Sequence, residues 1–395
     1  QRQMCIRDRT SADEALPGYE FSARISQRLW DGWETRSEIE RQAYRVDSAA
    51  LRVLERSEFL GLEAVRLYLE VLRLAEVVKL ADDNLTYHRE VLSRIEGAYD
   101  QGVVGIGDLQ QAEERVYLAE DTLTLTQLDL TDAKIFFLEV VGIEATNLQS
   151  VADIASTLPS TLDKTIALAR VKNPTFRFMQ ADVGAAEALS RTIDANKYPS
   201  LNLEAEARYG EDMRGFEGDV RDARVGLVLR YSLQGNSNRA NRQEHVRRVS
   251  EARANLLTTS RQVERQTRLT WSNLQTVRRR IVLIREQARL SADLRASYEA
   301  EFEIGNRSLL DVLNTQASLF QAEVDLATAK SLETFAEYRV LAAVGILLPT
   351  LGIEPPEDAQ IYARDEQGAP GVRAAENQDR FDAKSFGTWR AKQGN

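Results

Sequence analysis

The chain alternates between two hydrophobic periods, and each period predicts a type of element. Short stretches place an apolar side chain at every second position, as a strand with one apolar face does. Long stretches use spacings of three and four, as an amphipathic helix does. The alternating stretches begin near Phe21, Leu201 and Val225. They are about 9–11 residues long, which is the length of a tilted membrane-spanning strand.

Aromatic residues gather at both ends of the alternating stretches. At one end these are Trp30, Trp33, Tyr198 and Tyr231, and at the other Tyr19, Tyr209 and Phe216. Aromatic girdles at both membrane interfaces are typical of transmembrane β-barrels, so the first group is predicted to lie at an interface. The alternative is a half-buried hairpin of a water-soluble protein, which has the same alternation.

The longest helical pattern runs without proline from Gly32 to about Tyr99, which corresponds to roughly 100 Å. Its apolar seam follows a four-three spacing. The members are Leu60, Ala64, Leu67, Val71, Leu74, Val78, Ala81, Leu85, His88, Leu92, Ile95 and Tyr99. A second partial stripe, Leu69, Leu80, Tyr87 and Val91, predicts neighbours on two sides of this helix. His88 is interpreted as a polar residue that sets the helix register, with a pH switch as the alternative.

A repeat organises the whole chain. Two glycine-containing turns, Gly102–Asp108 and Gly305–Asp311, lie between long helical patterns and are 203 residues apart. The same offset relates Gly142 to Gly345, so a unit of strand, long helix, tip and returning helix is duplicated. The glycines expected to form the tip turns are Gly102, Gly105, Gly107 and Gly305.

The repeat also predicts the domain organisation. Unit one is expected at 21–145, a connector at 146–162, unit two at 163–348 with two strands within 198–233, and a C-terminal tail at 349–395. The offset places the start of unit one about 40 residues before Gln1, so the front of this unit is expected to be missing. Residues 1–20 fit neither element of the repeat and are expected to be an artefact of truncation.

Composition excludes several functional classes. A net charge of −10 and a pI near 5.1 argue against a nucleic-acid binder, which needs a basic surface. With one cysteine and two distant histidines, neither a thiolate cluster nor a catalytic zinc site is expected. No cofactor motif or catalytic constellation is present, so the protein is not predicted to be an enzyme. No apolar run is long enough for a transmembrane helix, but a strand barrel gives a weaker signal.

The order of elements and several short motifs resemble the TolC family of outer-membrane channels. The motifs are Phe302–Leu313, its weaker copy Tyr99–Leu109, the junctions Leu29–Gly32 and Leu233–Gly235, and Tyr198–Leu201. The resemblance runs from about Phe21 to Ile353, and it implies a mainly α fold of long helical hairpins. In such a homotrimer the hairpins form a periplasmic α-barrel, and each protomer gives four strands to a shared outer-membrane β-barrel. Three of the four strands are expected in this chain.

The resemblance also implies partners and a location. The partners would be a periplasmic adaptor protein, an inner-membrane transporter that is either ABC-type or proton-driven, and outer-membrane lipid. No nucleic acid is expected. The chain would lie in the outer membrane of a Gram-negative bacterium, with most of its length in the periplasm.

A gate at the periplasmic tips is a further implication of the resemblance. The family's tip arginine and its aspartate partner correspond to Arg307 and Asp108. Phe302 replaces a supporting tyrosine, Asp311 matches an aspartate ring at the constriction, and Asn314 replaces a second ring aspartate. From the residues alone, Asp108 and Asp311 are equally well explained as helix caps, since each lies where a helix begins.

The leading hypothesis is a passive exit duct of a tripartite system, for type I protein secretion or for small-molecule and drug efflux. The stretches Val71–Glu76 and His88–Leu92 resemble channels of type I secretion. The alternative is a periplasmic adaptor or structural protein made of helical hairpins without a pore. An enzyme with a coiled-coil insertion is a third hypothesis, but no segment remains to house an active site.

Overall fold

The computed structural model describes residues 19–149, 151, 154–211, 218–233 and 235–369. Most of the N-terminal piece, the loop aromatic Phe216 and the tail after residue 369 therefore lie outside the described residues. The chain forms two compact units. The strand unit takes its residues from 1–44, 183–252 and 364–371, and the helical unit from 45–182 and 253–363.

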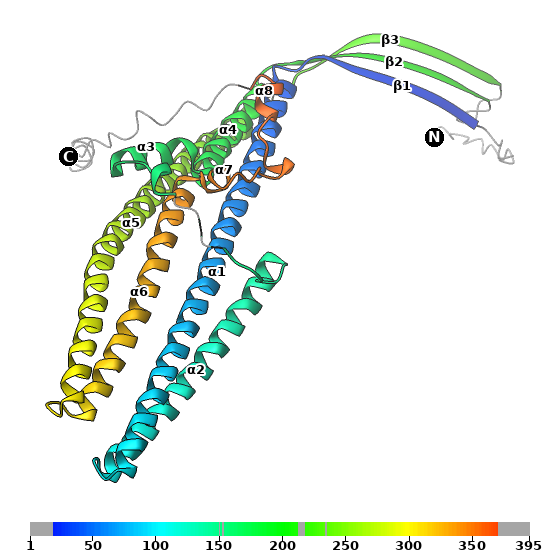
Figure 1. Ribbon diagram of the computed structural model, residues 1–395. Helices are drawn as coiled ribbons and strands as arrows, with labels where there is room; N and C mark the ends of the chain where they lie inside the picture. Colours follow the sequence, from blue (N-terminus) through cyan, green and yellow to red (C-terminus); the bar gives the residue numbers. More distant parts are fainter. Residues whose placement is uncertain (1–18, 150, 152–153, 212–217, 234, 370–395) are drawn as a thin grey trace, which may run out of the picture. The chain divides into compact units, whose positions relative to one another are not determined.

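The strand unit contains one antiparallel sheet in the order β1, β2, β3 (Figure 1). The strands are β1 (Tyr19–Trp30), β2 (Ser200–Glu211) and β3 (Asp219–Arg230). Ile25 pairs with Ala205, which pairs with Val225, so the predicted apolar positions share one face. Ile25 and Val225 are 72% and 75% exposed, so none of the described residues covers this face at these two positions. The three predicted strands are confirmed.

Two long hairpins run side by side in the helical unit (Figure 1), and only the first parts of α1 and α5 belong to the strand unit. One consists of α1 (Glu34–Asp100) and α2 (Ile106–Val141), the other of α5 (Gly235–Glu303) and α6 (Leu309–Val344). The bounds of α2 and α6 differ by the predicted 203 residues. None of the helices in the described ranges is long and apolar enough to cross a membrane.

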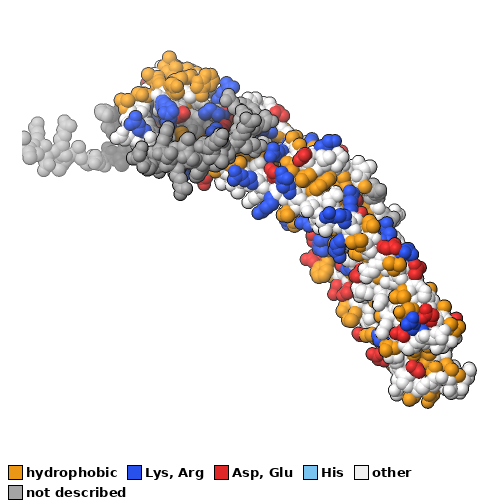
Figure 2. Space-filling view, turned by 90° about the vertical axis from the view of Figure 1, so that its left-hand side faces the viewer, with side chains coloured by type: hydrophobic (Ala, Val, Ile, Leu, Met, Phe, Trp, Pro, Cys, Tyr) orange, Lys and Arg blue, Asp and Glu red, His pale blue; other side chains and the backbone are white. Residues whose placement is uncertain are grey.

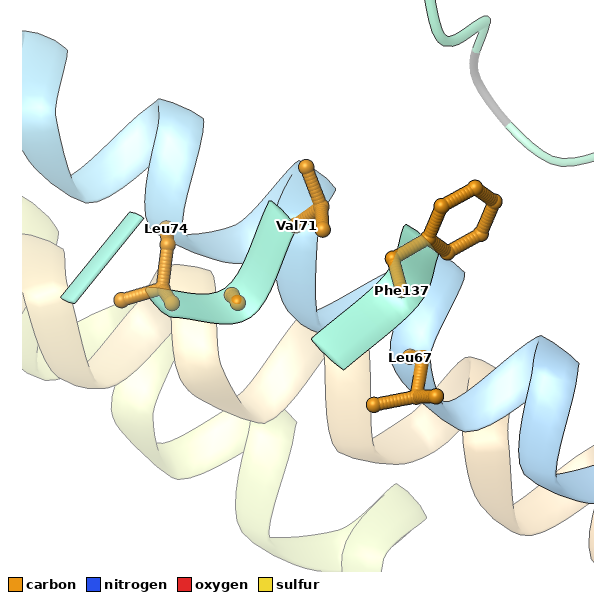
Figure 3. Close-up of a cluster of buried hydrophobic side chains, with 5 residues drawn as sticks. Leu67, Val71, Leu74 and Phe137 are labelled. Atoms are coloured by element: carbon orange, nitrogen blue, oxygen red, sulfur yellow. The ribbon is translucent and has the colours of Figure 1, made fainter. Parts of the chain in front are cut away.

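The helices pack in the order α2, α1, α6, α5. Leu67, Val71 and Leu74 of α1 form a buried cluster with Phe137 of α2 (Figure 3). Val91 and Ile95 of α1 pack against Leu309 and Leu313 of α6, and Leu274 of α5 packs against Ala336 and Val340 of α6. The central helix α1 therefore has neighbours on two sides, as its two apolar stripes predicted. The mainly α fold with long hairpins is confirmed.

Shorter elements join the hairpins. They are η1 (Ala155–Thr157), α3 (Leu162–Lys172), α4 (Pro174–Ala195), α7 (Leu347–Thr350), η3 (Glu357–Ala359) and α8 (Ala363–Glu366). The predicted break at Asn173 separates α3 from α4. The Asn173 amide nitrogen donates to the Ala343 carbonyl (3.0 Å), and its Oδ1 accepts from the Phe176 N–H (3.1 Å). This side chain therefore starts α4 and fixes it against the end of α6.

Two buried carboxylates on α1 hold the segment that follows α6. Glu58 accepts hydrogen bonds from the N–H groups of Leu347 (3.1 Å) and Leu348 (3.3 Å), and Asp47 accepts one from Ala363 (3.1 Å). Glu58 and Asp47 are only 4% and 0% exposed. Burial raises the pKa of Glu58 from 4.5 to about 7, although the backbone donors oppose this shift.

We predict that Glu58→Gln removes a pH dependence of stability. Because the folded-state pKa of Glu58 is raised, its favourable contribution is complete below pH 4.5 and is lost as the pH rises through about 7. The thermal midpoint of the parent should fall by about 2 °C or more between pH 5 and pH 8, measured by circular dichroism. Glu55→Gln, at an exposed site on the same helix, should keep the parental profile. An unchanged profile in Glu58→Gln would contradict the assignment.

Candidate functional site at the hairpin tips

Both hairpins end in the same backbone turn. Gly102 has φ +71° and Gly305 has φ +77°, a conformation that favours glycine. The N–H of Gly102 donates to the Tyr99 carbonyl (2.8 Å), and that of Val103 donates to the Ala98 carbonyl (2.9 Å). Gly305 and Asn306 repeat this pattern at 2.9 Å each, which is the Schellman arrangement of a helix end. The duplication is therefore preserved down to individual hydrogen bonds.

The other two predicted tip glycines have no such backbone requirement. Gly105 is the N-cap of α2 with φ −84°, and Gly107 lies inside that helix. A Cβ atom at either position would meet nothing within 4 Å. The first tip also exposes Val103 (73%) and Ile106 (52%). The first tip is therefore uncrowded and partly apolar.

Arg307 is fixed to its own hairpin. Its Nη2 and Nε lie 2.7 and 2.9 Å from one carboxylate oxygen of Glu301. Its guanidinium carbon lies 3.9 Å from the ring centroid of Tyr298, a cation–π contact. The hydrogen bond to Glu301 raises the pKa of Arg307 further. Within the described chain, the ion pair of Arg307 is therefore with Glu301 and not with Asp108.

Local backbone geometry explains this pairing. The N–H of Asn306 donates to the carbonyl of Glu301, so the tip turn folds the residue after it back onto the last turn of α5. Glu301 thus lies beside Arg307 without any contribution from the other hairpin. The sequence interpretation missed Glu301 and Tyr298. The sequence spacing could have indicated both residues as partners of Arg307, since both precede it by less than three helical turns.

The two tip aspartates differ in their bonds. Ser308 is the N-cap of α6: its hydroxyl accepts from the Asp311 N–H (3.2 Å) and donates to the Asp311 carboxylate (2.8 Å). Asp311 is thus part of a reciprocal cap. Asp108 lies in the first turn of α2, whose N-cap Gly105 offers no side chain. The negative charge of Asp108 in this first turn interacts favourably with the helix dipole.

The remaining two gate candidates connect the hairpins. Phe302 packs against the apolar cluster that includes Val91 of α1 and Leu309 of α6. Asn314 of α6 accepts a hydrogen bond from Arg115 of α2 at 3.4 Å. Both side chains therefore hold the second hairpin against the first. Arg115 was not among the predicted site residues.

A buried polar layer lies above the tips, between α1, α5 and α6. Gln316 donates to Asn84 at 2.8 Å, and the two residues are 4% and 8% exposed. Arg295 donates to the Gln316 side-chain oxygen at 3.1 Å and lies 5.2 Å over the ring of Tyr87. Buried amides of this kind need specific partners, so they fix the register of the two hairpins.

His88 belongs to the same level of α1. It is 4% exposed, and burial together with the charge of Arg115 lowers its pKa to about 4. The imidazole is therefore neutral near pH 7, which favours the register-setting interpretation over a pH switch. Its ring packs edge-to-face against Tyr87 at 5.7 Å.

The predicted interface aromatics lie at one end of the sheet. Trp30 packs edge-to-face on Tyr198, with ring centroids 5.9 Å apart. Trp33 has φ +74° and is 62% exposed, and Tyr231 is 55% exposed. Exposed aromatic rings at the end of an apolar strand face fit a membrane–water interface.

Comparison with known sequences identifies relatives over most of the chain. The family model described as outer membrane efflux protein matches residues 6–142 and 165–345. Outer membrane efflux protein BepC of Brucella suis biovar 1 (strain 1330) is 24% identical over 344 residues, which cover 86% of this chain and 75% of that protein. Outer membrane protein TolC of Vibrio cholerae serotype O1 (strain ATCC 39315 / El Tor Inaba N16961) is 25% identical over 360 residues, covering 85% and 78%.

Solved structures share the fold. CusC superimposes with a TM-score of 0.71 at 14% identity, covering 83% of this chain and 77% of that one. The outer membrane protein VceC of Vibrio cholerae superimposes with a TM-score of 0.66 at 16% identity, covering 86% and 88%. The long hairpins and the strands of the present chain thus belong to a known architecture.

We predict that Gln316→Ala destabilises the protein by about 1–3 kcal/mol, because the Asn84 amide and Arg295 then lose a buried partner. Chemical denaturation, followed by circular dichroism, measures this change. Gln321→Ala on the same helix is the matched control, since among the described residues Gln321 bonds to the exposed Asp325 of its own helix. Equal effects of the two substitutions would show that the buried layer has no special role.

Proposed function

Because the chain belongs to the outer membrane efflux protein family, we propose that it is the passive outer-membrane duct of a tripartite export system. One observation carries the proposal: long duplicated hairpins occur in one chain with a sheet whose apolar face is uncovered. An apolar strand face with exposed aromatics at its end suits lipid, and helical hairpins suit a water-filled periplasmic wall. A periplasmic adaptor without a pore would leave this strand face unexplained.

The proposal includes a location, partners and cargo. The strands would lie in the outer membrane and the hairpins in the periplasm, with 21–145 and 163–348 as the two repeat units. The tips would meet a periplasmic adaptor, which connects the duct to an inner-membrane transporter of ABC or proton-driven type. Three exposed apolar tip residues, Val103, Ile106 and Ile304, support such a contact. The cargo would be a type I secreted protein or a small molecule.

The internal duplication supports a homotrimer. Within one chain, α1 of the first unit packs against α6 of the second. The repeat makes α5 equivalent to α1 and α2 equivalent to α6. An equivalent contact between α5 and α2 has to join two copies, because these helices lie at opposite edges of the helix order. Such head-to-tail contacts generate a ring where the rotation between copies closes, and the ring that we propose has three copies.

The two edge helices carry complementary exposed seams. On α2, spacings of three and four combine apolar and acidic residues: Glu114, Leu118, Asp121, Leu125, Leu128, Asp132, Ile135 and Glu139. On α5, the seam is mainly arginine and leucine, with one glutamate: Arg261, Arg265, Arg268, Arg279, Leu283, Glu286 and Leu290. Basic side chains are prominent along the helical part of the face in Figure 2. Opposite charges beside apolar contacts favour pairing of α2 with α5 of a second copy.

The two seams also match in height. At 1.5 Å per residue, Leu125 lies about 28 Å above the start of α2, and Leu283 lies about 30 Å above the end of α5. Asp132 and Arg279 lie at about 39 and 36 Å. With the tips level, leucine thus meets leucine and aspartate meets arginine.

The tips are proposed as the gate. Arg307 has a carboxylate in its own hairpin, Glu301, and Asp108 in the first tip is the partner implied by the family resemblance. If Arg307 exchanges between these two carboxylates, it couples the two hairpins through a weak, solvent-exposed ion pair. A partner protein can therefore open such a gate. Asp311, repeated by three-fold symmetry, would place negative charge around the axis.

We predict that the full-length protein conducts ions in planar bilayers and that Arg307→Ala raises its resting conductance. The substitution removes an ion pair that is proposed to hold the tips closed, so the open population should rise by a few fold. Arg289→Ala is the control, because Arg289 pairs only with exposed carboxylates of its own helix. A protein that never conducts would refute the duct. A conducting protein that Arg307→Ala leaves unchanged would refute only the role of Arg307.

We predict that Asp132→Arg and Arg279→Asp each reduce the trimer fraction and that the double variant restores it. Each single change places like charges in the proposed contact, and the double change exchanges them. Light scattering of the detergent-solubilised protein measures the oligomer. Asp325→Arg, an exposed reversal on α6, should leave the oligomer intact. A double variant no better than the single ones would contradict this pairing.

A further inference from the structure

The polar face of the sheet carries charge in an ordered pattern. We infer that Arg24 and Arg224 on this face make the strand end of the duct favour anionic solutes. The inference rests on the proposed function, because it requires the polar face of the sheet to line the lumen. It concerns selectivity, which the family relationship does not assign.

A single carboxylate on the central strand is shared by arginines of both neighbouring strands. Arg24 of β1 pairs in register with Glu206 of β2, which pairs in register with Arg224 of β3. Arg24 Nη2 lies 3.2 Å from Oε1 of Glu206, and Arg224 Nε lies 3.1 Å from Oε2. Arg208 Nε approaches the same carboxylate at 3.4 Å. The single negative charge of Glu206 is thus shared by three arginines.

Exposure separates the two signs of charge. The Glu206 side chain is 9% exposed, whereas those of Arg24 and Arg224 are 63% and 62% exposed. Arg230 and Glu204 repeat this arrangement, with 63% and 28% exposure and a separation of 2.7 Å. The arginines of the outer strands therefore cover the carboxylates of the central strand. Water beside this face meets guanidinium groups.

The excess of positive charge is local. Arg208 also contacts Asp222 at 3.3 Å, and Arg230 contacts Glu204, so these arginines each have a carboxylate of their own. Arg28 lies within 3.6 Å of Asp31 and 3.3 Å of Glu34. The layer of Arg24, Glu206 and Arg224 instead holds two exposed arginines for one covered carboxylate.

Such a layer would act on permeating ions. Arginine remains protonated at every physiological pH, and its planar guanidinium group binds carboxylates and phosphates in bidentate fashion. The opposite face of the sheet is apolar, and a low-dielectric wall strengthens the field inside a narrow pore. Three copies of the layer around one lumen would attract anions and repel cations. This sign is opposite to that of a ring of Asp311 at the tips.

Reversal potentials in a KCl gradient across planar bilayers test the inference on the full-length protein. The double variant Arg24→Gln/Arg224→Gln should lower the ratio of chloride to potassium permeability by about twofold or more. Glu206→Gln should raise that ratio, because it removes the only carboxylate of the layer. The two changes have opposite signs, which a general loss of folding would not produce.

Arg221→Gln is the matched control. Arg221 lies on β3, as Arg224 does, but on the opposite face of the sheet. There it pairs in register with Tyr209, and its guanidinium group lies over the Tyr209 ring. Its substitution should leave the permeability ratio unchanged. If the channel conducts but neither the double variant nor Glu206→Gln changes its selectivity, the inference is overturned and the proposed function stands. A parent protein without conductance would overturn the proposed function, and the inference with it.

Discussion

A helix in a single row of helices can bury only the sides that face its neighbours. The central helix α1 has two neighbours and buries two stripes, one against α2 and one against α6. The outer helices α2 and α5 pack mainly against α1 and α6, respectively, so seams on their other sides remain exposed. The uncovered seams follow from this constraint. Exposed seams of this length are unfavourable in water, which is why we proposed that a second copy covers them.

Close packing also determines where polar residues are placed. The seams of α2 and α6 are rich in alanine, including Ala112, Ala119, Ala322 and Ala329, and small side chains let the helices approach closely. In so tight a contact a buried amide has to find its partner within the protein. Gln316 and Asn84 therefore bond to one another, and that bond defines one relative position of the two hairpins. The positions of the tips depend on this register.

The two tips show how a duplicated backbone acquires different chemistry. Each turn is fixed by one glycine with positive φ and by the same two backbone hydrogen bonds. The other side chains do not determine the turn, so they were free to diverge. The first tip exposes Val103 and Ile106, whereas the second directs Arg307 onto Tyr298 and Glu301. The sheet combines the same two elements: backbone pairing defines its register, and the side chains add its charges.

The sequence by itself determined the periodic features: the strands, the long helices, their apolar stripes and the 203-residue offset. These depend on short-range geometry, because a helix or strand repeats its own spacing. Only the tertiary structure decided the partners of individual polar groups, such as Glu301 for Arg307, Arg115 for Asn314 and Asp47 for Ala363. A periodic pattern identifies the face of a helix but not which of several charged groups lies within hydrogen-bond distance. That choice depends on how turns and neighbouring helices position each side chain in space.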